Sequence, residues 1–193
     1  MNEDALSNLH RLYRQTQQFD KLADILATRI DSGAQPINEL RYELVEIVIE
    51  KEPERALELL KQILWDENDN EKAVAALESL LANKDLVGDS AEILEPRYAQ
   101  NGDDEKLAKL LEAKIEVSQD PVDKLTYTKQ LAQIQRDKLG DDSAALASYR
   151  NALVCDPSDA DVMNAIEEIA EKIERWDDLA QAYAKAIEVA SDD

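Results

Sequence analysis

Apolar residues recur at steps of three and four along nearly the whole chain. No stretch alternates between apolar and polar residues over the length of a strand. Steps of three and four place apolar side chains on one face of an α-helix. The sequence therefore predicts an all-α fold. One clear example of the spacing is the run Leu22, Ile25, Leu26 and Ile30.

Glycine and proline mark where one amphipathic run ends and the next begins. Only four Gly and five Pro occur, and most lie between runs. Pro96 lies inside a run, where its ring clashes with the carbonyl four residues earlier. We expect that helix to be kinked or to begin later. The chain is predicted to form eleven helices, at residues 3–15, 19–32, 36–50, 54–66, 71–83, 89–100, 104–118, 121–138, 142–155, 160–173 and 177–190.

The sequence repeats itself. A shift of 85 residues superimposes Tyr13 on Tyr98, and a shift of 89 residues superimposes Leu64 on Leu153. A period of this length, several helices long, is typical of stacked helical repeats. We therefore predict a single domain over residues 1–193. It would hold a partial copy (1–35), a full copy (36–120) and a second partial copy (121–193).

One segment of the second copy carries a specific motif. Gly140 opens it, Ala145 is followed by Tyr149 four residues later, and Ala152 and Pro157 complete the spacing. This segment resembles the second half of a tetratricopeptide repeat (TPR). The segments around residues 19–30 and 105–115 keep only the hydrophobic frame. The resemblance implies a right-handed α-α superhelix, a TPR-like solenoid of about eleven antiparallel helices. We expect the chain to be a segment of a longer bacterial repeat protein.

The charge of the chain excludes several functions. The sequence has 22 Lys and Arg against 43 Asp and Glu, a formal net charge of −21. Phosphate backbones and anionic membranes bind cationic surfaces, so we expect no nucleic acid as partner. The most apolar stretch, Leu44 to Ile49, is far shorter than a membrane span, and no secretory signal is visible. We expect no membrane insertion and a cytoplasmic location by default.

The sequence shows no catalytic or metal-binding constellation. His10 has no nucleophile pattern near it, and Cys155 is a lone thiol. The loop from Asp66 begins like a calcium loop but has Glu71 where Gly is needed and Leu77 where Glu is needed. We expect no enzyme activity, no cofactor and no metal. Phe19 and Trp176 occupy equivalent positions of the repeat, and we expect both rings to pack against other side chains. The alternative is that they form a platform on which bases or sugars stack.

The TPR resemblance implies where a partner binds. In that family the first helix of each pair lines the concave face, and its non-core positions contact the ligand. The resemblance thus implies that the chain is a protein-protein interaction scaffold. We expect it to bind a basic or amphipathic segment of another protein. The candidate partner-binding residues are Asp4, Ser7, Arg11, Arg14, Asn38, Arg41, Val45, Asp161, Asn164, Glu168 and Glu171.

Two other functions remain open at this point. The chain could be a structural segment that self-associates through its end helices, in which case the concave face binds nothing. It could also be a regulatory repeat domain attached to an enzyme. Ordinary solvated helix faces would explain the candidate residues equally well.

Overall fold

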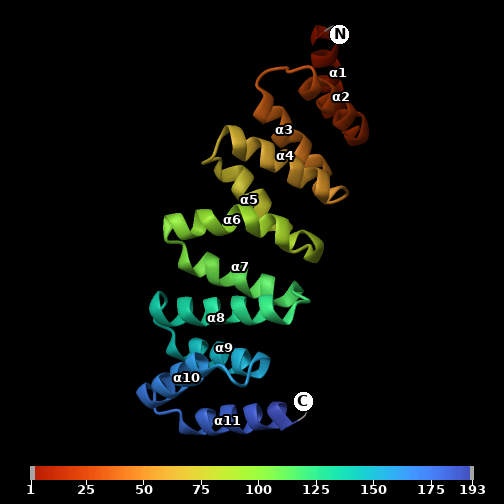
Figure 1. The fold of residues 1–193 in the computed structure, drawn as a ribbon. Helices are drawn as coiled ribbons and strands as arrows, with labels where there is room; N and C mark the ends of the chain where they lie inside the picture. The colour runs from red at the N-terminus through yellow and green to blue at the C-terminus, as the bar shows by residue number, and fades with distance from the viewer. Residues whose placement is uncertain (1–2, 192–193) are drawn as a thin grey trace. The chain divides into compact units, whose positions relative to one another are not determined.

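The structure, a computed structural model, describes residues 3–191 and the side chains of the last helix up to Glu188 (Figure 1). Within these residues it contains eleven α-helices, one short 3-10 helix and no strand, which confirms the all-α prediction. The elements are α1 (Glu3–Gln15), α2 (Phe19–Asp31), α3 (Ile37–Val48), α4 (Pro53–Asp66), α5 (Glu71–Leu80), η1 (Lys84–Leu86), α6 (Val87–Asn101), α7 (Asp104–Val117), α8 (Pro121–Asp137), α9 (Asp142–Cys155), α10 (Ala160–Lys172) and α11 (Trp176–Ser191).

The helix around Pro96 decides one of the two alternatives that the sequence left open. Helix α6 begins at Val87 and continues through Pro96 to Asn101, so the alternative of a later start is wrong. A proline removes one backbone donor from the helix. Leu94 and Tyr98, on either side of Pro96, are 0% and 4% exposed. Both side chains belong to the core of unit 2.

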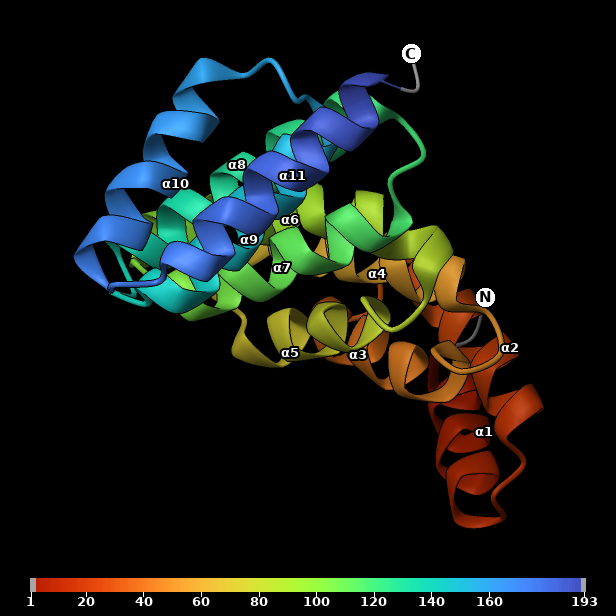
Figure 2. The ribbon, with the colours of Figure 1, turned by 90° about the horizontal axis from the view of Figure 1, so that it is seen from below.

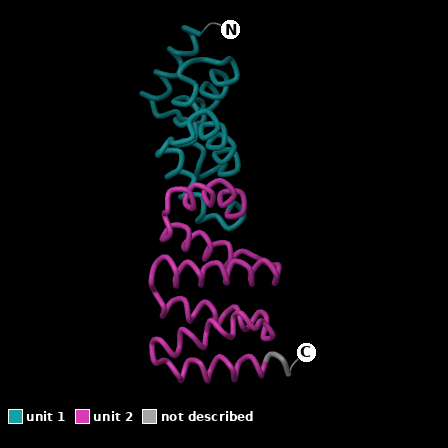
Figure 3. The backbone as a smooth tube through the Cα atoms, turned by 60° about the vertical axis from the view of Figure 1, so that its left-hand side comes forward, with its two compact units in different colours: residues 1–86 teal, residues 87–193 magenta. Residues whose placement is uncertain are grey.

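The chain divides into two compact units, residues 1–86 and 87–193 (Figure 3). Unit 1 contains α1 to α5 and η1, and each of its α-helices packs against the next. Unit 2 contains α6 to α11, which also pack in chain order. Helix α11 contacts both α9 and α10, and Figure 2 shows it lying over α9. A single domain over the whole chain stays a prediction.

The helices recur at the spacing found in the sequence. Shifting α2 by 85 residues gives 104–116, and α7 spans Asp104–Val117. Shifting α4 by 89 residues gives 142–155, the bounds of α9. A contact recurs as well: the Nζ of Lys21 and of Lys106 each lie 5.6 Å from the ring centroid of Tyr13 and Tyr98. The five α-helices of unit 1 thus correspond to α6 to α10.

The cores are built from the apolar stripes that the sequence predicts. Leu26, Leu60 and Leu77 of unit 1 are all 0% exposed. Full burial of a leucine side chain contributes about 1.5 to 3 kcal/mol. Unit 2 contains a buried cluster of Ala145, Leu146, Ala152, Leu153, Val162, Ile166, Ile169, Ala170, Ala182 and Ala186. Small residues in this cluster let α9, α10 and α11 approach closely.

Side-chain caps at equivalent positions of the repeat mark the starts of α5 and α10. Asn70 Oδ1 accepts a hydrogen bond from the backbone N–H of Ala73 at 3.0 Å, at the start of α5. Asp159 Oδ1 accepts from the N–H groups of Asp161 and Val162 at 3.1 Å, at the start of α10. The two caps lie 89 residues apart in the sequence. Each satisfies donors that the first turn of a helix leaves without an internal partner.

Candidate functional site

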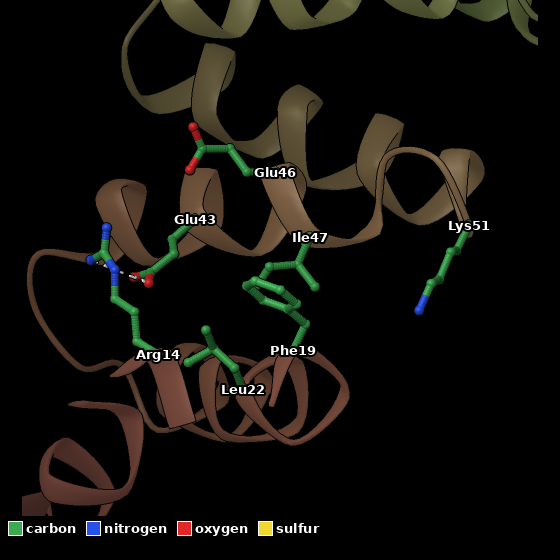
Figure 4. Close-up of a pocket in the computed structure, with 7 residues that line it drawn as sticks. All are labelled: Arg14, Phe19, Leu22, Glu43, Glu46, Ile47 and Lys51. Atoms are coloured by element: carbon green, nitrogen blue, oxygen red, sulfur yellow. Dashed lines mark ion pairs between the residues drawn. The ribbon is translucent and has the colours of Figure 1, made fainter. Parts of the chain in front are cut away.

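A hollow of about 310 Å³ opens in unit 1 where α1, α2 and α3 meet (Figure 4). The end of α1 contributes Arg14, and the first turn of α2 contributes Phe19 and Leu22. Helix α3 contributes Glu43, Glu46 and Ile47, and Lys51 follows it. Figure 4 shows the ring of Phe19 beside the side chain of Ile47, with the charged groups above and around them. We call this the apolar hollow.

A second hollow of about 660 Å³ adjoins the first. The two share Arg14, Glu43 and Glu46. We call the second the acidic hollow, and the two together the unit 1 groove. The acidic hollow is lined by Arg14, Asn38, Glu39, Tyr42, Glu43, Glu46, Glu67, Asn70, Glu71 and Lys72.

Negative charge dominates the acidic hollow. Its lining has five glutamates against one arginine and one lysine. Within the described residues, no cation lies within ion-pair distance of Glu39, Glu46 or Glu71, and all three are exposed. Lys72 lies over the ring of Tyr42, with its Nζ 5.8 Å from the ring centroid. The groove therefore holds three carboxylates that have no ion-pair partner among the described residues.

Two side-chain amides hold the carboxylate of Glu67 at the edge of the acidic hollow. The Nδ2 of Asn38 donates to its Oε1 at 2.9 Å, and the Nδ2 of Asn70 donates to its Oε2 at 2.7 Å. Hydrogen bonds to a carboxylate favour its charged form. Both hydrogen bonds lower the pKa of Glu67, and the one from Asn38 has the larger effect. This carboxylate keeps its charge to a lower pH than an ordinary glutamate.

The candidate residues of α1 are divided by the structure. Arg14 lines both hollows and lies 3.4 Å from Glu43. Asp4 and Arg11 are exposed on α1 and do not line either hollow. Ser7 donates to Glu3 at 3.4 Å and also lies outside the hollows. The groove therefore uses only the last turn of α1.

The candidate residues of α3 have three different environments. Asn38 lines the acidic hollow. The Arg41 side chain is 14% exposed and pairs with Asp66 at 2.5 Å, so it braces α3 against the end of α4. Val45 is 1% exposed, and its assignment to a binding surface is wrong. Helix α3 packs against both α2 and α4, and residues on either flank of its apolar stripe become core.

The candidate residues of α10 belong to unit 2, whereas the groove residues belong to unit 1. Asp161, Asn164 and Glu171 are exposed. Glu168 accepts a hydrogen bond from Arg136 of α8 at 2.9 Å, which raises the pKa of the Arg136 guanidinium. The role of these four residues in binding stays a prediction.

The groove also contains residues that the sequence analysis missed. Glu39, Glu43 and Glu46 follow steps of four and three along α3, and this spacing places them on one face of a helix. That acidic row could have been found from the sequence. Phe19 was expected to serve packing, but it is 51% exposed and lines the apolar hollow.

Trp176, which was also expected to serve packing, is 56% exposed. Phe19 and Trp176 begin their helices, where neighbouring helices cover less of the side chain. Trp65, at the end of α4, is 90% exposed. None of these three rings is buried in a core.

The loop considered as a calcium site uses its polar groups internally. Asp66 pairs with Arg41, Glu67 accepts from two asparagines, and Asn70 caps α5. In the part of the chain that the structure describes, no group of three or more His, Cys, Asp or Glu is placed to hold a metal ion. None of the described helices has the length and apolar character needed to cross a membrane.

The helices that form one wall of the groove match a known family. The model of the tetratricopeptide repeat matches residues 5–36, which cover most of α1, all of α2 and the turn that follows. The prediction of a TPR-like helical repeat is thereby confirmed, and the match lies on a segment that keeps only the hydrophobic frame of the family's motif.

Solved structures of MamA are similar to the chain. One is 15% identical, with a TM-score of 0.39, and the match covers 95% of this chain and 95% of that chain. A second, MamA MSR-1 C2, is 20% identical with a TM-score of 0.37, over 96% of this chain and 95% of that chain. A search of curated proteins finds no match to this sequence.

Proposed function

We propose that this chain is a non-catalytic protein-binding scaffold whose unit 1 groove holds a basic or amphipathic segment of another protein. The observation that carries the proposal is an acidic hollow in which Glu39, Glu46 and Glu71 have no ion-pair partner among the described residues, adjoining the apolar hollow that the exposed ring of Phe19 lines. Lysine or arginine side chains of the partner would pair with the carboxylates. An apolar side chain of the partner would pack on Phe19 and Ile47.

The two kinds of contact have different roles. An exposed ion pair contributes only about 0.2 to 1 kcal/mol, so three such pairs provide modest affinity. Their larger effects are faster association and selection against acidic partners. Apolar contact contributes about 25 cal/mol per Å² of buried surface and would hold the segment once it is oriented. This division favours an amphipathic segment over one that is only basic.

The match of the tetratricopeptide repeat model to residues 5–36 supports the proposal because this segment supplies Arg14, Phe19 and Leu22 to the groove. The net charge of −21 supports it as well, since the whole chain attracts cationic partners over the distance of a Debye length. The carboxylates of Glu39, Glu46 and Glu71 would then determine where on the chain such a partner binds.

The proposal is tested with a fluorescent probe peptide that carries lysines on one helix face and leucines on the other. Its matched control replaces every lysine with glutamate. We expect the lysine peptide to bind at about 50 mM salt and to lose about tenfold in affinity at about 300 mM salt, because salt screens the carboxylates. Fluorescence anisotropy measures both affinities. Equal binding of the two peptides would contradict the proposal.

A further inference from the structure

The one histidine of the chain lies directly behind the unit 1 groove. The His10 ring contacts Arg29 of α2 through Nδ1, at 2.8 Å from Nη1, and Glu43 of α3 through Nε2, at 2.9 Å from Oε2. The side chains of His10 and Glu43 are each 16% exposed, and that of Arg29 is 10% exposed. His10 therefore joins the three helices that form the apolar hollow.

The partners of His10 determine its protonation state. A guanidinium group has only donors, so Nδ1 must accept the hydrogen bond from Arg29. Nε2 then carries the proton and donates it to the Glu43 carboxylate. His10 is neutral in this arrangement, with its proton on Nε2.

Protonation of His10 would break this arrangement on one side and tighten it on the other. A proton on Nδ1 would face the Arg29 guanidinium, donor against donor and cation against cation. Arg29 would keep its pair with Glu3 of α1, 2.9 Å away, and release the ring. The imidazolium would form an ion pair with Glu43, whose other cationic contact is Arg14 at 3.4 Å. The imidazolium would thus neutralise the charge of Glu43, one of the carboxylates that line the groove.

The second copy of the repeat has a different pair at the same place. A shift of 85 residues takes His10 to Glu95 and Arg29 to Lys114. Lys114 pairs with Glu95 at 2.7 Å. Carboxylates and lysines ordinarily keep their charges between pH 5 and 8, whereas histidine ordinarily changes charge in this range. Of these two equivalent positions, only the one in unit 1 carries a histidine, the residue type that ordinarily changes charge in that window.

We propose that His10 regulates the unit 1 groove by proton uptake: the neutral ring bridges Arg29 and Glu43, and the protonated ring releases Arg29, neutralises Glu43 and weakens the hold on a basic segment. This regulation rests on the proposed function. The groups that set it are Glu3 and Arg14 of α1, Arg29 of α2 and Glu43 of α3. Each of them contacts His10 or one of its two direct partners.

The test compares the wild-type chain with His10→Gln at about pH 7.5 and about pH 5.5. A glutamine can accept from Arg29 and donate to Glu43, as neutral histidine does, but it cannot take up a proton in this range. We expect the affinity of wild-type protein for the lysine probe peptide to fall about three- to fivefold at the lower pH. The affinity of His10→Gln should stay constant.

A second readout needs no peptide. Nitrogen NMR of the single imidazole distinguishes the two neutral tautomers, and we expect the proton on Nε2 at about pH 7.5. A proton on Nδ1 at that pH, or the same pH dependence of binding in wild-type and His10→Gln proteins, would overturn the regulation alone. Absence of peptide binding at both pH values would overturn the proposed function and the regulation with it.

Discussion

Leu26→Ala is expected to lower the free energy of unfolding of this chain by about 2 to 5 kcal/mol. Leu26 is 0% exposed on α2, and α2 packs between α1 and α3. Truncation removes buried methyl groups and leaves a cavity that the packed helices fill only in part. Urea unfolding followed by circular dichroism measures the change.

The matched control for this prediction is Leu12→Ala on α1. Leu12 is 49% exposed, so its truncation leaves no enclosed cavity. We expect a loss of less than about 1 kcal/mol, within the range of substitutions outside a core. Equal losses for the two variants would contradict the buried position of Leu26 on α2.

Reversal of two groove charges, Glu39→Lys together with Glu46→Lys, is expected to weaken binding of the lysine probe peptide by tenfold or more, about 1.4 kcal/mol or above. Both glutamates are exposed, and within the described residues neither has an ion-pair partner. The substitution replaces two attractions with two repulsions and removes no hydrogen bond or ion pair of the described residues. Fluorescence anisotropy compares the variant with the wild-type chain.

A second pair, Asp161→Lys with Glu171→Lys on α10, controls for net charge. It changes the total charge of the chain by the same amount but leaves the groove intact. We expect its affinity for the peptide to fall only about two- to threefold, through the loss of long-range attraction. A larger loss for the α10 pair than for the groove pair would move the binding site to α10.

The fold could be predicted closely because its helices obey local rules. Helix α9 has the predicted bounds, since Asp141 caps its first turn and Pro157 follows its end. The prediction for α5 was three residues too long because it ends at Leu80 and the short helix η1 follows. The spacing of leucines does not distinguish the last turn of an α-helix from a 3-10 turn.

The site could be predicted only in part. Arg14 and Asn38 line the groove, as expected for non-core positions of α1 and α3. Val45 was misplaced because a helix that packs on both sides buries residues at the edge of its apolar stripe. The environment of His10 depends on Arg29 and Glu43, which lie 19 and 33 residues away in the sequence. No local pattern reports contacts of that separation.

The family match lies outside the segment with the clearest TPR-like spacing. The motif over residues 140–157 stands out by its small and aromatic residues. Residues 5–36 lack this motif and keep the apolar frame of two paired helices. That frame determines how the helices pack, because buried leucines can fill the space that an aromatic ring fills elsewhere.

The most direct test of the central claim is to locate the bound peptide. The lysine probe peptide is given a photo-reactive group next to its leucine face, cross-linked to the wild-type chain, and mapped by mass spectrometry. We predict cross-links within residues 14–72, at the end of α1, the first turn of α2, α3 and the first turn of α5, and their loss in the Glu39→Lys/Glu46→Lys variant. Cross-links confined to α10, or unchanged in that variant, would contradict the assignment of the unit 1 groove as the binding site.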